Sequence, residues 1–154
     1  MNIRAAAQDD AGAIAALLRE AFGEYEAFYT RAGYVATTPN AVVIAARLAD
    51  GPAFVADLES SIAGTVSTVA RGASLYVRSM AVAPSARGRG VGRALMQEVE
   101  RVASERTSSR IYLSTTPFLF DAIRLYESLG YRRSGEPPDD LYGTPLFTMA
   151  KRLV

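Results

Sequence analysis

Hydrophobic and polar residues alternate with a helical period in the first third of the chain. Apolar residues recur every three or four positions over Gln8–Phe22, which predicts an amphipathic helix with Asp9 and Asp10 as candidate caps. A second helical piece is expected over Glu24–Ala32, ending at Gly33.

A third helix is expected just before the pattern changes. Thr38 is its candidate N-cap, Pro39 stands in its first turn, and its apolar residues carry it toward Gly51. After it, β-branched and alternating residues predominate, which is typical of strands. The runs that we expect to form strands are Asn2–Ala6, Ala53–Leu58, Ile62–Arg71, Leu75–Val82, Ile111–Leu113, Tyr131–Ser134 and Leu146–Arg152.

Two further helices are expected in the second half. The loop Ser85–Gly90 leads into a strongly amphipathic helix, and Thr116 with Pro117 predicts the cap and first turn of another, which stops at Gly130. This order of elements predicts an α/β or α+β fold, in which helices cover both faces of a mixed, mostly antiparallel and twisted sheet of six to seven strands.

Length and composition are those of one globular domain. The chain has 154 residues, of which 49% are hydrophobic and 21% charged, so we expect residues 1–154 to form a single domain and not a disordered or fibrous protein. No apolar stretch approaches the roughly 20 residues that cross a bilayer, and the N-terminus has no signal-peptide core. We therefore expect a soluble, cytoplasmic protein with no membrane partner.

Two residue types are missing, and this excludes several chemistries. The sequence has no Cys and no His, which rules out disulfides, thiolate nucleophiles, imidazole bases and the usual zinc ligands, and we expect no bound metal. The net charge is only +1, although all 17 basic residues except Lys151 are arginine. A strongly basic balance would be more typical of a nucleic-acid-binding protein.

The segment with the most specific pattern is the glycine- and arginine-rich loop RGRGVGR over residues 87–93. A strand runs into it and a helix begins inside it. Glycines let an anion approach the backbone, and the first N–H groups of a helix have no internal partner, so the loop predicts a phosphate site. It lacks the Gly-Lys-Ser/Thr that a P-loop requires and the final glycine of the dinucleotide-binding fingerprint. Neither of these phosphate motifs fits, and the pattern that remains is R-x-x-G-x-G.

Two blocks of the sequence together resemble the GCN5-related N-acetyltransferases (GNAT). The first is MAVAP over residues 80–84 followed by RGRGVG over residues 87–92, and it is similar to the family's hydrophobic–x–Val–x–Pro strand end and its Gln/Arg-x-x-Gly-x-Gly/Ala loop. The second is AIRLYESLGY over residues 122–131. The resemblance extends to the order of elements over nearly the whole chain, and it implies a sheet splayed where Met80–Val82 diverges from Ile111–Leu113.

The resemblance also implies acetyl-CoA as cosubstrate. The loop would hold its pyrophosphate with Arg87, Gly88, Arg89, Gly90, Val91, Gly92 and Arg93, and the main chain of Met80, Ala81 and Val82 would pair with its pantetheine arm. Tyr126 corresponds to the family's frequent general acid. The strand Leu75–Val82 has no carboxylate where many relatives have a glutamate base; Tyr76 lies nearby and is a candidate proton relay. Leu119 stands where many relatives have an asparagine that contacts CoA.

The acceptor of the acetyl group is expected to be a primary amine, on a small molecule or a peptide. In the family the first helices wall this site, which makes Glu24, Tyr25, Phe28 and Tyr29 the candidates here. The alternative for these four residues, and for Tyr126 and Tyr76, is that they only pack in the interior. Asp139 and Asp140 could attract a cationic amine, and the alternative is that they are simply exposed loop charges.

The expected function is acetyl transfer by direct attack of the amine. The alternatives are a non-catalytic acyl-CoA-binding or regulatory module and, less in keeping with the charge, binding of nucleic acid through the arginines. A homodimer remains an option.

Overall fold

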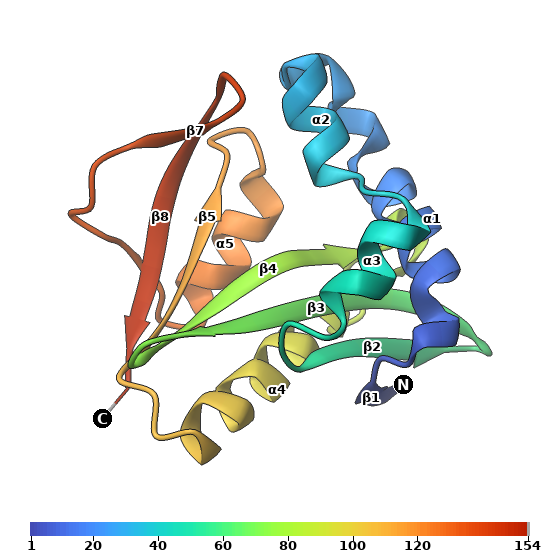
Figure 1. Ribbon diagram of the computed structural model, residues 1–154, viewed down its shortest axis with the longest axis horizontal. Helices are drawn as coiled ribbons and strands as arrows, with labels where there is room; N and C mark the ends of the chain where they lie inside the picture. The colour runs from blue at the N-terminus through green and yellow to red at the C-terminus, as the bar shows by residue number, and fades with distance from the viewer. Residues whose placement is uncertain (154) are drawn as a thin grey trace.

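The computed structural model describes residues 1–153 and contains one eight-stranded sheet (Figure 1). The strand order is β1-β2-β3-β4-β5-β8-β6, β7 pairs with β8, and every pair is antiparallel except β4 with β5. The strands are β1 (Asn2–Ala5), β2 (Ala53–Leu58), β3 (Ser61–Arg71), β4 (Ser74–Val82), β5 (Arg110–Thr115), β6 (Arg132–Arg133), β7 (Asp139–Leu141) and β8 (Thr144–Arg152). The predicted fold class is confirmed, and the strand beyond the expected seven is β7, which forms inside a segment that the sequence marks only as turn-rich.

Helices cover both faces of the sheet, as predicted (Figure 1). One hydrophobic cluster joins α4 and α5 to the sheet, and a second joins α1 and α3 to its other side. The helices are α1 (Ala11–Phe22), α2 (Arg31–Thr37), α3 (Ala41–Arg47), α4 (Val91–Glu105) and α5 (Phe120–Ser128), with short 3-10 turns η1 (Gln8–Asp10), η2 (Gly23–Phe28) and η3 (Pro84–Ala86).

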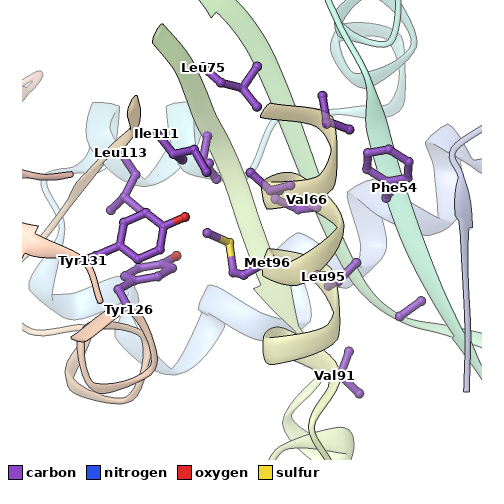
Figure 2. Close-up of a cluster of buried hydrophobic side chains, with 14 of the residues drawn as sticks. Phe54, Val66, Leu75, Val91, Leu95, Met96, Ile111, Leu113, Tyr126 and Tyr131 are labelled. Atoms are coloured by element: carbon purple, nitrogen blue, oxygen red, sulfur yellow. The ribbon is translucent and has the colours of Figure 1, made fainter. Parts of the chain in front are cut away.

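The larger cluster is centred on α4 (Figure 2). Leu95 and Met96 are fully buried between the helix and side chains such as Val66 of β3. Gly64 of β3 allows the close approach, because a Cβ there would lie 2.6 Å from Cγ1 of Val91. This packing places the N-terminus of α4 against β3 and beside the end of β4, because Gly64 pairs with Val82.

Two predicted helix starts are wrong. Asn40, and not Thr38, caps α3: its Oδ1 accepts a hydrogen bond from Val43 N at 3.0 Å, whereas the Thr38 hydroxyl donates to a carbonyl at the end of α2. Helix α5 begins at Phe120 rather than after Thr116, because the carbonyl of buried Thr116 accepts a turn hydrogen bond from Leu119 N at 3.3 Å.

The second helical piece also differs from its prediction. The chain forms the 3-10 turn η2 and then α2, which passes through Gly33 instead of ending there. Gly33 is buried because α2 contacts the β7–β8 turn, where a Cβ would lie 2.8 Å from the carbonyl oxygen of Leu141.

The predicted cap at the start of α1 is made differently. The Asp10 carboxylate accepts a hydrogen bond from Ala7 N at 2.7 Å and pairs with Arg4 at 2.8 Å, so it stabilises η1 and ties it to β1 rather than capping α1 itself.

Strands β4 and β5 separate partway along their length. They pair only from Ser74 with Arg110 to Val77 with Leu113. Just beyond, Ser79 has φ +61 and the register of β4 against β3 shifts, which marks a β-bulge. The expected divergence of residues 80–82 from β5 is present, and it opens the sheet at this point.

Candidate active site

A cleft of about 870 Å³ begins where β4 and β5 separate. Its walls come from the end of α1, the helices α2 and α3, the bulged half of β4, the glycine loop before α4, helix α5 and the β7–β8 turn. Ligand sites for small molecules typically measure about 300–1,000 Å³ and lie at such breaks in a sheet. The cleft is therefore the candidate functional site.

The backbone of the glycine loop provides one end of the cleft. Gly88 and Gly90 have φ values of +77 and +81, and a Cβ on either would meet no atom within 4 Å. Within residues 1–153, none of the backbone N–H groups of residues 88–93 donates a hydrogen bond. Since unpaired N–H groups at a helix N-terminus attract anions, the loop fits a phosphate.

The arginine side chains of the loop do not converge on one point. Arg87 pairs with Glu24 and donates to the carbonyl of Ala21 at 3.2 Å, so it joins the loop to the end of α1. Arg89 pairs with the exposed Glu59 at 3.1 Å and does not line the cleft. Arg93 donates to Ser128 Oγ at 2.9 Å. The unpaired backbone N–H groups, more than the arginine side chains, therefore make the loop a candidate anion site.

Val91 and Gly92 line the cleft but are also packing residues. The Val91 side chain is 1% exposed, in the cluster around α4. A Cβ on Gly92 would lie 2.8 Å from Cδ2 of Leu125, so this glycine lets α4 and α5 approach each other.

The predicted strand edge borders the same cleft. Met80, Ala81 and Val82 all line it. Because β4 pairs with β5 only as far as Val77, this stretch pairs with β3 on one side and leaves its other edge toward the cleft. Unpaired strand edges present N–H and C=O groups to an extended, amide-bearing ligand.

Tyr126 of α5 also lines the cleft and is only 5% exposed. Its hydroxyl makes no hydrogen bond to any described residue, and burial raises the pKa of the Tyr126 phenol. Tyr131 lies beside it with ring centroids 6.0 Å apart, and the two hydroxyls point toward Met96 (Figure 2). Tyr131 is fully buried, its hydroxyl is without a described partner, and it does not line the cleft.

The second tyrosine candidate, Tyr76, is half-buried on β4 and lines the cleft. The guanidinium carbon of Arg71 lies 4.1 Å from the centroid of its ring, and the ring of Tyr112 lies 5.0 Å away. These contacts are those of a packed sheet residue.

Two of the four predicted acceptor-site residues, Tyr25 and Tyr29, line the cleft, and two do not. Glu24 pairs with Arg87, and Phe28 is 63% exposed and stacks on Phe118 with centroids 5.5 Å apart. Burial raises the pKa of the Tyr29 phenol.

Several cleft residues were missed from the sequence. Arg47 at the end of α3, Arg78 of β4, Asp121 of α5 and Tyr142 after β7 all line it, whereas Asp139 and Asp140 do not. Asp121 is the one carboxylate among the described lining residues. The last-turn position of Arg47 was visible in the pattern, but nothing local separated it from other helix-end arginines.

Neither a membrane-spanning helix nor a cluster of metal-ligand side chains is present in residues 1–153. No helix there is long and apolar enough to span a membrane. No three His, Cys, Asp or Glu side chains in this part of the chain lie together as metal ligands would.

Comparison with known proteins points to one family. The model described as "Acetyltransferase (GNAT) family" matches residues 13–131. N-acetylaspartate synthetase from Danio rerio is 36% identical over 88 residues, which are 56% of this chain and 31% of that protein. The chain matches less than half the length of such curated relatives.

Solved structures share the fold over almost the whole chain. The PaiA N-acetyltransferase from Thermoplasma acidophilum, in complex with coenzyme A, has a TM-score of 0.84 at 14% identity and covers 99% of this chain and 98% of its own. A ribosomal-protein-alanine N-acetyltransferase from Brucella melitensis has a TM-score of 0.76 at 25% identity, and the match covers 99% of this chain and 100% of that one.

Proposed function

Because the chain belongs to the acetyltransferase (GNAT) family, we propose that it transfers an acetyl group from acetyl-CoA to a primary amine by direct attack in a ternary complex. The observation that supports this most is the row of unpaired backbone N–H groups over residues 88–93, placed directly after the free edge of β4. The relative that is solved with coenzyme A shares this fold.

The residues of the cleft fit acetyl-CoA. The N–H groups of the loop and the N-terminus of α4 would bind the pyrophosphate, where Gly88 and Gly90 leave open space. The main chain of Met80, Ala81 and Val82 would pair with the amides of the pantetheine arm, as a further strand would. When bound, acetyl-CoA supplies the activated thioester.

The chain's own contribution is positioning and charge stabilisation. The amine nitrogen bonds to the acetyl carbon, the carbon–sulfur bond breaks, the amine releases a proton, and the sulfur leaves as a thiolate that is then protonated. A backbone N–H on the free edge of β4 would polarise the acetyl carbonyl. Holding the two reactants together in the cleft removes the entropy cost of their encounter.

Tyr126 would donate a hydrogen bond to the departing sulfur. Burial raises the pKa of its phenol, so the hydroxyl stays protonated at neutral pH and acts as a donor. We assign no general base, because β4 carries no carboxylate and Tyr76 is packed between Arg71 and Tyr112. An amine that arrives partly neutral needs none.

The absence of a carboxylate on β4 also favours one alternative, a non-catalytic acyl-CoA-binding module of the same fold. Calorimetric titration with acetyl-CoA, followed by measurement of CoA release over a panel of amines, tests both functions. We expect binding and acceptor-dependent release. Binding without release on any amine would favour the module, and no binding would refute both.

A further inference from the structure

The end of the cleft away from the glycine loop carries two arginines that the proposed reaction has not used. Arg78 precedes Val82, the last residue of β4, by four positions, which is roughly 13 Å of strand at about 3.3 Å per residue. Arg47 reaches the same end from the last turn of α3. The pair thus borders the cleft before the bulge at Ser79, whereas the anion-binding loop follows the strand.

Arg47 and Arg78 carry two positive charges, and only one of them is paired with a carboxylate in the described part of the chain. The Nη2 of Arg78 lies 3.3 Å from Oδ2 of Asp50, a long contact to a carboxylate that is 50% exposed. The Nε of Arg78 is fully buried and has no hydrogen-bond partner among residues 1–153. Arg47 forms no ion pair within the same residues. One guanidinium group is therefore paired with a partly solvated carboxylate, and the other has no ion-pair partner among residues 1–153.

Both arginines are half-buried, which makes their unmatched charge costly. Burial, and next the charge of Arg78, lower the pKa of Arg47. An arginine nevertheless keeps its charge in proteins, so a bound anion is what would offset the cost of burying these two charges. The only acidic residue among the described cleft-lining residues, Asp121, lies on α5 near Tyr25 at the other wall.

The space left for an acceptor is limited, because the whole cleft measures about 870 Å³ and the proposed reaction places the pantetheine arm of acetyl-CoA in part of it. Thr30 N donates to Thr144 Oγ1 at 2.9 Å, and the Thr30 hydroxyl donates to the carbonyl of Tyr142 at 2.9 Å, so the start of α2 is joined to the β7–β8 turn. These hydrogen bonds hold two walls of the cleft together, and Arg47 and Arg78 line the same cleft.

We infer that Arg47 and Arg78 bind an oxyanion of the acceptor, so that the acetylated amine is a small molecule that also carries a carboxylate or a phosphate. A guanidinium fork matches either group in a bidentate way. A polyamine or another polycation would be repelled. This inference rests on the proposed acetyl transfer, and it assigns these arginines to acceptor specificity and not to acetyl-CoA.

The test compares amines with and without the anion. The carboxylate arm uses ω-amino acids of increasing length against their carboxamides, and the phosphate arm uses phosphoethanolamine against ethanolamine. The value of kcat/KM for CoA release is measured for the unaltered protein, for Arg47→Gln/Arg78→Gln, and for Arg106→Gln. Arg106 is a matched control, exposed at the far end of α4 from the loop.

We expect the unaltered protein to prefer the anionic amine in at least one of the two arms. A preference in the carboxylate arm identifies the anion as a carboxylate, and a preference in the phosphate arm identifies it as a phosphate. Loss of a charge-assisted hydrogen bond predicts that the double variant loses about 10- to 100-fold in kcat/KM on that substrate. It should keep its rate on the neutral partner and its calorimetric affinity for acetyl-CoA. The control variant should match the unaltered protein in all of these.

Three results would overturn the inference while leaving acetyl transfer intact. The first is that the unaltered protein uses the neutral amines as well as or better than the anionic ones. The second is that the double variant loses kcat/KM equally on both members of a pair. The third is that the double variant loses affinity for acetyl-CoA, which would assign the arginines to the cosubstrate. Acetyl-CoA binding with no amine acetylated would overturn the transfer reaction and this inference together.

Discussion

Replacing Tyr126 with Phe separates a role in the reaction from a role in packing. The ring remains in the hydrophobic cluster, and only a hydroxyl that has no described hydrogen-bond partner is removed. The variant should therefore unfold at nearly the same urea concentration as the unaltered protein. Any change in rate then comes from the missing hydrogen bond.

The size of the effect follows from the two pKa values. A thiol near 8.5 facing a tyrosine near 10 makes full proton transfer uphill by about 1.5 units, or about 2 kcal/mol. Burial raises the pKa of Tyr126 and widens this gap, so the hydroxyl acts by donating a hydrogen bond to the thiolate. Such a bond to a charged group contributes about 1.5–3 kcal/mol. We expect Tyr126→Phe to lower kcat by about 10- to 150-fold.

The assay measures CoA release at saturating acetyl-CoA as a function of pH. Since the raised pKa keeps the Tyr126 hydroxyl protonated at least up to about pH 10, the profiles of the variant and the unaltered protein should have the same shape and differ in height. Acetyl-CoA affinity should be unchanged.

Tyr131→Phe is the matched control for this experiment. It removes a buried hydroxyl 6.0 Å away, ring to ring, from a residue that does not line the cleft. We expect an unchanged kcat. If Tyr126→Phe also keeps its full rate, the hydroxyl has no part in the reaction and Tyr126 is a packing residue.

Three other substitutions test the loop and the stability of the fold. Gly90→Val should abolish acetyl-CoA binding in calorimetry while circular dichroism stays that of a folded protein, because a side chain would stand in the open space at φ +81; Gly12→Val, on an exposed turn of α1, should bind normally. Gly92→Val should cost about 1–3 kcal/mol in urea unfolding, because its Cβ would already lie 2.8 Å from a side-chain carbon of α5 and its two methyl groups would add to the crowding. The hydrogen bond from Arg4 lowers the pKa of Asp10, so Asp10 stabilises the fold above its unfolded pKa of about 3.9 and loses this effect as the pH falls through its lower folded value. The deficit of Asp10→Asn in urea unfolding should then be present at pH 7 and shrink below about pH 4, and a deficit that persists in acid would contradict the ion pair as its cause.

The elements with a strong pattern were predictable, and their ends were not. Helix α4 and the central strands carry long periodic runs, so their burial follows from the sequence alone. At the start of α3, however, Thr38 and Asn40 are both good capping residues two positions apart. Which one caps depends on where α2 stops: the Thr38 hydroxyl donates to a carbonyl of α2, so Asn40 caps α3. The pattern ends the earlier helical piece at Gly33, but this glycine lies inside α2 and packs against the β7–β8 turn, more than 100 residues away along the chain.

The candidate site divides in the same way. The loop over residues 87–93 and the edge of β4 are contiguous in sequence, so a local motif was sufficient to find them. The other end of the cleft is assembled from α3, β4 and the β7–β8 turn. Arg47 has the sequence context of any arginine that stabilises a helix C-terminus through the helix dipole. Only the fold brings it to Arg78.

The glycines of the loop show why a motif match alone does not establish a binding site. Gly88 and Gly90 have positive φ values and face open space, so substituting them acts first on the ligand and on backbone strain. Gly92 has an ordinary helical position and touches Leu125, so substituting it acts first on the packing of α4 against α5. Both kinds of substitution would lower activity, so an activity assay alone would not distinguish them. Measured together, affinity and unfolding free energy should separate them, since Gly90→Val loses affinity in a protein that remains folded and Gly92→Val loses stability before it loses affinity.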